Sequence, residues 1–218
     1  MDQEQRKLVL DKEKEKRKKL VLYDAIEVFK LTGIENSKMT DIAEKSKIGV
    51  ATLYRYFDTK TEIVIGAAAI MWEEKISILY NKFEEPNFME LNGAQRVREI
   101  LNLFMILYRS YPEYLSFLEH FDNYIVKEDI PMENLSSYEN IINDTKAAIF
   151  GAIDVGKFDG SIHNEIDNDI FYITTTHSLM SLCQKLILRG TILKSDKDIH
   201  GEIQLETLID MAMLYLSK

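Results

Sequence analysis

The sequence predicts an all-α protein of about nine helices, built as a small N-terminal domain and a larger C-terminal domain. Its 218 residues contain only 3 prolines and 9 glycines, too few chain breakers for an all-β sandwich. Apolar residues recur along most of the chain at the spacing of helix faces. Hydrophobic residues at 46% and charged residues at 29% are typical of a globular protein. We expect the domains to be residues 1–65 and 66–218.

The first helix begins with a run of mixed charge over residues 2–20. Leu22, Ala25 and Phe29 then recur at i, i+3 and i+7 on one helix face, and Gly33 is expected to end the helix. The charged extension, residues 1–20, has two interpretations. It is a solvated helical extension, or it is a basic arm that touches DNA phosphate.

The second and third helices are short and closely spaced. Ser37 and Thr40 offer start signals for the second helix. Lys47, Ile48 and Gly49 interrupt it, and residues 50–57 form a third short helix. We expect Ile48 and Leu53 to fill the angle between the two helices, as in a helix-turn-helix.

A long helix is expected over residues 60–83. Thr59 and Glu62 have the spacing of a helix-capping pair at its start. Weak breakers divide the remaining chain, the last of them between Gly190 and Asp198. The helices predicted beyond residue 83 cover residues 90–110, 112–127, 133–155, 164–189 and 201–217.

The outward residues of the third helix suit contact with DNA. Thr52 can hydrogen bond to a base edge, and Arg55 can reach guanine or phosphate. Tyr54 and Tyr56 can donate their hydroxyls to phosphate oxygens. Lys60 stands at the start of the next helix, where its ammonium and the helix end both favour a phosphate.

These motifs resemble the N-terminal domain of the TetR family of bacterial transcriptional regulators. The resemblance runs from Leu22 to Ile63 and is carried by AIEVF before Gly33, DIAEKS, TLYRYF, and Lys60 after a short Asp-Thr spacer. It implies a homodimer that binds a palindromic operator in double-stranded DNA and is released by a small-molecule effector. The DNA-binding residues it implies are Lys38, Met39, Thr40, Val50, Ala51, Thr52, Tyr54, Arg55, Tyr56 and Lys60, the last as a phosphate anchor.

Two positions depart from the family pattern. Lys47 occupies the turn position usually held by glycine, where a left-handed backbone costs a non-glycine residue about 1 kcal/mol. Gly49 occupies the cap position usually held by serine or threonine and is a weaker cap. Both departures affect the geometry of the turn without breaking the motif.

Charge is divided unevenly along the chain. Residues 1–60 contain 14 Lys and Arg against 11 Asp and Glu, whereas residues 61–218 contain 13 against 25. The N-terminal part is therefore net basic, although the whole chain carries a net charge of −9. This asymmetry is compatible with DNA binding by the N-terminal domain alone.

Catalytic and metal-binding patterns are not found. Residues 151–157 match the first seven positions of a P-loop, but Phe158 replaces the serine or threonine that holds magnesium. The four histidines lack metal-site spacing, and the single cysteine, Cys183, has no catalytic neighbours in sequence. We therefore expect no enzyme activity and no cofactor. The lack of a long apolar run and the cysteine usage favour a cytoplasmic protein without membrane contact.

The C-terminal domain is expected to bind the effector, which its acidity suggests is apolar or cationic. Ile170, Ile173, His177 and Met180 share one helix face, so His177 is either a core histidine or a ligand contact. The candidate ligand-binding residues are Met71, Trp72, Phe104, Tyr108, Phe117, Phe121, Tyr124, Thr145, Ile173, His177 and Met180.

The last two helices are apolar on more than one side, which indicates burial on two sides. The family resemblance implies that they build a four-helix dimer interface. The stripes assigned to it are Phe171, Leu179, Leu182 and Leu186 on one helix and Leu205, Leu208, Ala212 and Tyr215 on the other.

The sequence thus predicts a ligand-responsive regulator, with repression favoured by the resemblance. The alternative is a small-molecule carrier or adaptor whose helix-turn-helix does not bind DNA. An all-α enzyme is the third hypothesis and has no catalytic residues in its favour.

Overall fold

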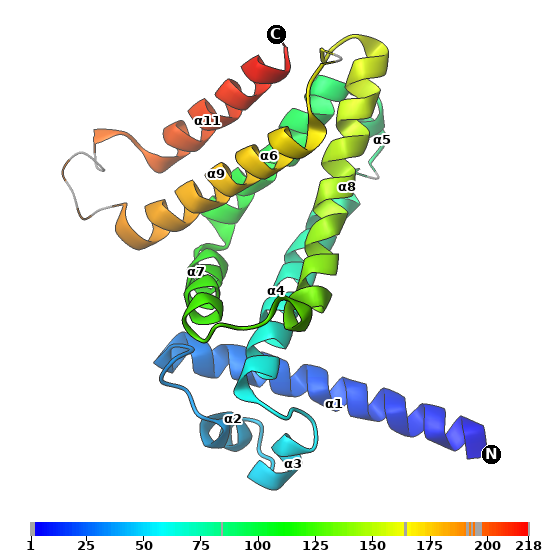
Figure 1. Cartoon of the computed structure of the whole chain (residues 1–218), viewed down its shortest axis with the longest axis vertical. Coiled ribbons are helices and arrows are strands. Elements are labelled where there is room, and N and C mark those ends of the chain that lie inside the picture. The colour runs from blue at the N-terminus through cyan, green and yellow to red at the C-terminus, as the bar shows by residue number, and fades with distance from the viewer. Residues whose placement is uncertain are drawn as a thin grey trace. The chain divides into compact units, whose positions relative to one another are not determined.

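The computed structural model describes residues 3–83, 85–163, 165–190, 192, 194 and 198–217, and every regular element among them is a helix (Figure 1). The predicted all-α class is confirmed. The elements are α1 (Gln3–Thr32), α2 (Met39–Lys45), α3 (Val50–Tyr54), α4 (Lys60–Phe83), α5 (Pro86–Met89), α6 (Gly93–Ser110), α7 (Pro112–Lys127), the 3-10 helix η1 (Met132–Leu135), α8 (Ser136–Asp159), α9 (Asn168–Arg189) and α11 (Gly201–Leu216).

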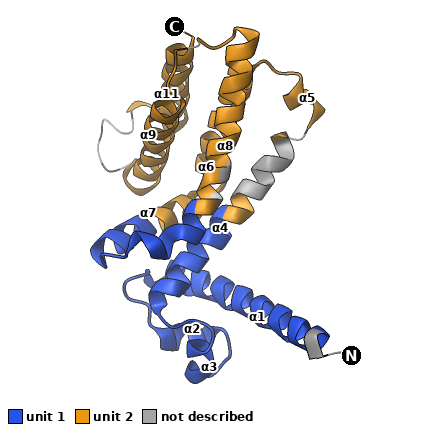
Figure 2. Ribbon diagram, turned by 45° about the vertical axis from the view of Figure 1, so that its right-hand side comes forward, with its two compact units in different colours: residues 1–72, 120–139 blue, residues 73–119, 140–218 orange. Residues whose placement is uncertain are grey.

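Contacts divide the chain into two compact units (Figure 2). Unit 1 contains residues 1–72 and 120–139, and unit 2 contains residues 73–119 and 140–218. Unit 1 therefore combines the expected N-terminal domain with the second half of α7 and with η1. Its core includes Ala25, Ile42, Leu53 and Ile63, all of which are fully buried.

The end of α1 has the geometry that its sequence predicts. Gly33 follows the last helical residue with φ of 79°, a left-handed conformation that glycine adopts without steric cost. The N–H of Gly33 donates to the carbonyl of Phe29 at 2.9 Å and closes the last turn.

The start of α2 differs from the expectation. Lys38 is the N-cap residue, and its backbone N–H donates to the Asp41 carboxylate at 2.9 Å. Ser37 is buried and donates its hydroxyl to the Ile34 carbonyl at 2.7 Å, so it serves the preceding loop rather than the helix. The prediction of Ser37 and Thr40 as start signals is wrong, because the helix start is capped by the Asp41 carboxylate, which accepts from the backbone N–H of Lys38.

The capping pair predicted before α4 is present. The N–H of Glu62 donates to the Thr59 hydroxyl at 3.1 Å. The Glu62 carboxylate accepts from the N–H of Asp58 at 2.8 Å, one residue earlier than in a standard capping box. These bonds fix the direction in which the chain leaves the helix-turn-helix.

In unit 2, α8 runs past Gly156, the residue expected to end it, and stops before Gly160 at φ of 78°. Gly156 instead permits a close crossing. A Cβ on Gly93, the first residue of α6, would lie 2.0 Å from the Gly156 nitrogen. The prediction that this helix ends at residue 155 is therefore wrong, since α8 ends at Asp159. Much of the divider expected at 190–198 lies outside the described residues.

Candidate functional site

The third helix presents one buried and one exposed face. Leu53 is fully buried against α2, whereas Val50, Ala51, Tyr54 and Arg55 are exposed. This exposed face is free to approach a ligand as large as a duplex, because only one side of so short a helix is needed for packing. Thr52 and Tyr56 are half-buried at its edges.

The turn between α2 and α3 has the conformation that the sequence suggested. Lys47 adopts φ of 53°, so a lysine does hold the left-handed position. The N–H of Ile48 donates to the Ala43 carbonyl at 3.0 Å and closes the turn. Gly49 precedes α3 in an extended conformation and caps it without a side chain.

The start of α2 lies in the same compact unit and contributes polar groups. Lys38 and Thr40 are exposed and Met39 is half-buried. The Thr40 hydroxyl donates to Asp41 at 3.3 Å, and no hydrogen bond or ion pair occupies the Lys38 ammonium within the described part of the chain. Lys38 is therefore available for an anion.

Lys60 is placed differently from the expectation. Its ammonium donates to the carbonyls of Ile34, Glu35 and Ser37, at 2.8, 3.2 and 3.1 Å. These three carbonyls belong to the loop between α1 and α2. Lys60 was expected to anchor a phosphate, and in this structure loop carbonyls occupy the donors that a phosphate would use.

Aromatic and acidic groups complete the surroundings of Lys60. Its nitrogen lies 5.5 Å from the centre of the Tyr124 ring, in cation–π range. The Tyr124 hydroxyl bonds with that of Thr61 at 2.9 Å. Partial burial lowers the pKa of Lys60, and the carboxylates of Glu128 and Glu35 act in the opposite direction. Lys60 thus ties the α1–α2 loop to the start of α4.

The family comparison agrees with this geometry. Residues 21–67, which span α1 to the start of α4, match the family model described as bacterial regulatory proteins, tetR family. Residues 21–67 therefore form a helix-turn-helix domain of the TetR type. The proteins that this family model describes are bacterial regulatory proteins.

Solved structures of TetR regulators share the fold. A regulator from Haloarcula marismortui aligns with a TM-score of 0.68 at 12% identity, over 93% of this chain and 97% of that one. A tetR-family protein from Rhodococcus RHA1 gives 0.62 at 14% identity, over 93% and 97%. FadR from Bacillus subtilis, solved with stearoyl-CoA, gives 0.63 at 15% identity, over 90% and 97%. Comparison with curated protein sequences gives no significant match.

The predicted ligand-binding residues are divided between the two units. Met71, Trp72, Phe121 and Tyr124 are buried in unit 1. In unit 2, Phe104 and Phe117 are buried, whereas Tyr108, Thr145 and Met180 are half-buried. The Thr145 hydroxyl oxygen is itself buried and has no hydrogen-bond partner among the described residues. A Cβ on Gly201 would lie 2.5 Å from the Tyr108 hydroxyl, so that phenol packs on α11.

The two faces of α9 are exchanged relative to the prediction. Phe171 and Leu179, assigned to the dimer interface, are buried within the chain. Ile173 is 47% exposed and His177 is exposed, so the expectation of an inward stripe there is wrong. Both faces of α9 carry apolar residues, and periodicity alone cannot decide which one packs inside the chain.

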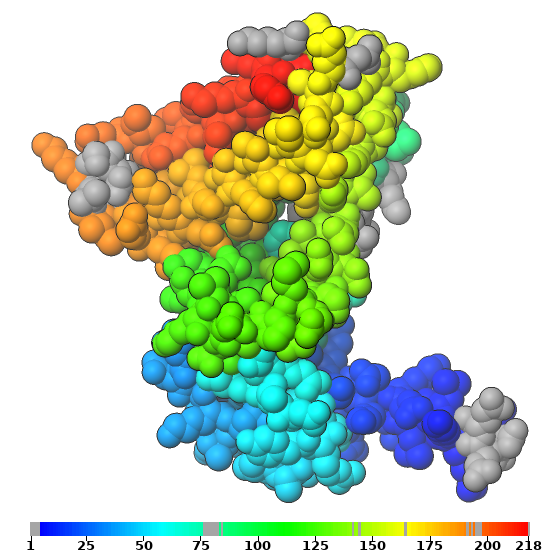
Figure 3. Space-filling view, in the orientation of Figure 1, coloured from blue at the N-terminus to red at the C-terminus, as the bar shows by residue number. Residues whose placement is uncertain are grey.

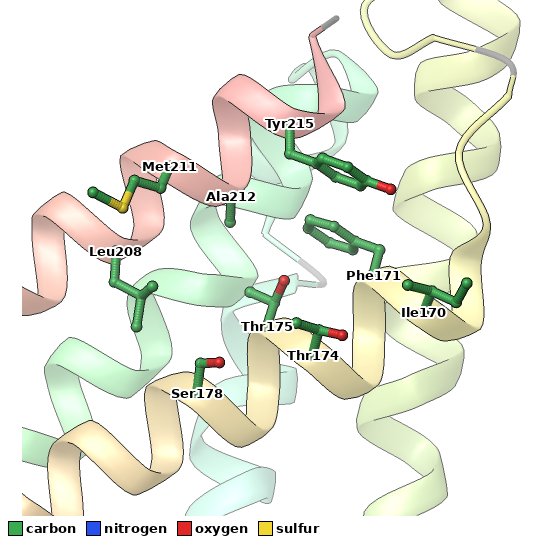
Figure 4. Close-up of a pocket in the computed structure, with 9 residues that line it drawn as sticks. All are labelled: Ile170, Phe171, Thr174, Thr175, Ser178, Leu208, Met211, Ala212 and Tyr215. Carbon is green, nitrogen blue, oxygen red and sulfur yellow. The ribbon is translucent and has the colours of Figure 1, made fainter.

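An apolar groove of about 320 Å³ lies between α9 and α11 (Figure 4). Phe171 and Tyr215 stack at its upper end with ring centres 6.4 Å apart. Met211 is 60% exposed on its rim. The residues that line it are Ile170, Phe171, Thr174, Thr175, Ser178, Leu208, Met211, Ala212 and Tyr215. Of these, sequence reasoning missed Thr175, Ser178 and Met211, which do not belong to any of the predicted stripes.

The remaining chemical candidates have structural roles. Lys157 of the P-loop-like segment donates to the Ile166 carbonyl and to Asn168, at 2.9 and 2.8 Å. Burial raises the pKa of the Cys183 thiol to about 12, which makes it a poor nucleophile. Within the described residues no group of side chains suits a metal ion, and none of the described helices is long and apolar enough to cross a membrane.

Proposed function

We propose that this TetR-family protein is a repressor that binds a palindromic operator as a homodimer and leaves it when a small-molecule effector binds. The observation that carries the proposal is the exposed face of α3, where Val50, Tyr54 and Arg55 stand free of the core. A short helix held by one buried leucine suits insertion into a major groove.

The side chains of this face have the chemistry of direct readout. Arg55 can pair with guanine, Val50 and Ala51 can contact a thymine methyl, and the Tyr54 hydroxyl can donate to phosphate. Lys38 supplies a free cation at the start of α2. In this proposal Lys60 acts on DNA binding by holding the α1–α2 loop, which connects α1 to the start of α2.

The groove between α9 and α11 supports the dimer. A second copy that presents the same groove would cover Met211, Tyr215 and Ile170, which stay exposed in one chain. An exposed, continuous apolar surface on two neighbouring helices is typical of a protein–protein interface. Two-fold pairing would place two recognition helices on successive half-sites, which implies a palindromic operator.

The effector is proposed to bind in the C-terminal region, among the buried aromatic residues. Phe104 and Phe117 supply apolar walls, and the Thr145 hydroxyl supplies a polar group for orientation. The net negative charge of residues 61–218 favours an apolar or cationic ligand. Stearoyl-CoA, bound by the Bacillus subtilis FadR, combines an apolar chain with an anionic head and makes an informative contrast.

Selection of bound duplexes from a randomised DNA pool at about 0.1 M salt tests the proposal. The expected result is enrichment of one palindrome. No enrichment by a folded, dimeric protein, repeated after unfolding and refolding to remove co-purified ligand, would overturn DNA reading and favour the carrier hypothesis.

The selected duplex then serves to test the effector. Titration of the complex with tetraphenylphosphonium, an apolar cation, and with stearoyl-CoA is followed by fluorescence anisotropy. Release by the cation supports the effector class proposed here. Release by stearoyl-CoA alone would contradict the charge argument.

A further inference from the structure

The first helix extends far beyond the core that it helps to build. The core face of α1 begins at Val21 and Leu22, yet the helix starts at Gln3. All of residues 5–20 are exposed except Lys18, which is half-buried. The space-filling view shows this N-terminal half standing free of the helices that pack on the other half (Figure 3). So long a helix with no core contact of its own calls for another role.

The cations of the extension are not evenly distributed around the helix. At 100° per residue, Arg6, Lys14 and Arg17 fall within about 80° of arc. Lys7 and Lys18 extend this arc to about 120°, and no acidic residue between residues 5 and 20 lies within it. We call the five residues Arg6, Lys7, Lys14, Arg17 and Lys18 the basic stripe.

The packing of α1 shows which side the basic stripe follows. Leu22 contacts α4, because a Cβ on Gly66 would lie 3.0 Å from its side chain. Val21 and Val28 form the other buried edge of α1, and because α1 also packs on α2, we infer that this edge is the α2 side. Arg17 lies one turn before Val21, and Lys14 lies two turns before it. The basic stripe therefore continues the α2 side of the helix.

The basic stripe also reaches the recognition element directly. The Lys18 ammonium lies 5.3 Å from the centre of the Phe57 ring, just beyond the end of α3. Figures 1 and 2 both show α2 and α3 together on one side of α1. The other four cations have no hydrogen bond or ion pair among the described residues, so their charge is available.

We propose that the basic stripe binds the phosphate backbone of DNA that flanks each half-site. This inference rests on the proposed DNA binding and adds a second, sequence-independent contact to it. Charge complementarity and the contact of Lys18 with Phe57, just beyond the end of α3, select DNA as the partner. From residue 6 to residue 17 the helix spans about 17 Å, the length of about five base pairs.

An apolar partner is not favoured at this extension. Leu8, Val9 and Leu10 are exposed, but consecutive residues of a helix point about 100° apart. They therefore form no stripe that another helix or a membrane surface would bury. The basic stripe, by contrast, gathers its side chains on one side of the helix.

The test compares charge removal on the two sides of the extension. In the first variant, Arg6→Gln, Lys14→Gln and Arg17→Gln remove three stripe charges. The salt dependence of binding to the selected palindrome, flanked by 15 base pairs on each side, is expected to lose about 2–3 units of slope per protomer. Affinity should fall at least tenfold on this duplex and stay unchanged on one trimmed to the half-sites.

In the control variant, Lys12→Gln, Lys16→Gln and Lys19→Gln remove the same charge from the opposite side. Equal losses of affinity and of salt slope in both variants would overturn the proposal for the basic stripe, because such losses would reflect net charge alone. Wild-type behaviour of the first variant would also overturn it, while leaving the proposed function intact. Circular dichroism of both variants checks that α1 stays helical. If the wild-type protein selects no palindrome, the proposed function fails, and this inference fails with it.

Discussion

At the scale of single residues, Lys60 changes the account most. Its position in the TLYRYF-Asp-Thr-Lys motif suggested a phosphate anchor, whereas three loop carbonyls surround its ammonium. The carbonyls of Ile34, Glu35 and Ser37, which accept from this ammonium, lie 23 to 26 residues away in sequence. No local pattern announces such a contact. The positive φ of Lys47 was predictable, because the turn geometry is itself local.

Substitution separates a lysine that holds a loop from a lysine that binds a phosphate. Lys60→Met should cost about 1–2 kcal/mol of stability, because the loop carbonyls lose a charged donor. It should leave the salt slope of DNA binding unchanged. Lys38→Gln, the matched control, should lower the slope by about 0.9 per protomer and leave stability unchanged. Chemical denaturation measures the stability of each variant, and salt titrations measure the slope. A lower slope with unchanged stability in Lys60→Met would restore Lys60 as the phosphate anchor.

Asp159 provides a residue-scale prediction for pH. Its carboxylate accepts from the N–H groups of Gly93 and Ser161, at 2.8 and 2.9 Å. The Ser161 side chain and these backbone donors hold the pKa of Asp159 below its usual value. Its contribution to stability is therefore present above about pH 4 and is lost as the pH falls through the lowered pKa.

The variant Asp159→Asn lacks this titration. Its melting temperature should lie below that of the wild type at neutral pH, and the gap should close at acid pH. Melting curves from pH 3 to pH 7 measure the gap. A gap that is constant over this range would mean that the carboxylate has no special role at the start of α6.

At the scale of elements, helix positions were more predictable than helix faces. The ranges 112–127 and 201–217 match α7 and α11 closely because breakers and apolar spacing are local signals. The exchange of faces on α9 has a different cause. The pair Ile170 and Ile173 is as apolar as the pair Phe171 and Leu179. Only tertiary packing decides which of the two pairs is buried.

The crossing of α6 and α8 gives a prediction with an internal control. Gly93→Ala should destabilise the protein by about 1–3 kcal/mol, because its Cβ would collide with the backbone of Gly156. Gly151→Ala should stabilise it by about 0.5–1 kcal/mol, because that helical glycine has no atom within 4 Å of an added Cβ. Urea denaturation compares the two. Equal effects would contradict the close crossing.

At the scale of the whole molecule, the proposed function depends on two surfaces of opposite character. Unit 1 presents the exposed face of α3, and unit 2 presents the apolar groove between α9 and α11. The family motif predicted the first surface residue by residue. It predicted only the helices of the second, because a groove depends on how two distant segments pack.

A charge placed in the groove should weaken the proposed dimer. Met211→Glu is expected to raise the dimer dissociation constant at least tenfold, about 1.4 kcal/mol, because the carboxylate would be desolvated there. Leu31→Glu, at an 82% exposed position on α1, is the control and should leave the constant unchanged. Sedimentation velocity over a range of concentrations measures it. An unchanged dissociation constant in Met211→Glu would mean that the dimer interface lies elsewhere.

Sequence-specific reading by α3 is tested by the ratio of affinities for the selected palindrome and for a scrambled duplex of equal length. Fluorescence anisotropy at 0.15 M salt measures both dissociation constants. The account predicts a ratio of at least about 10³, with most of it lost in Arg55→Ala, since the exposed face of α3 reads the bases. A ratio near one for the wild-type protein would contradict sequence-specific reading by α3.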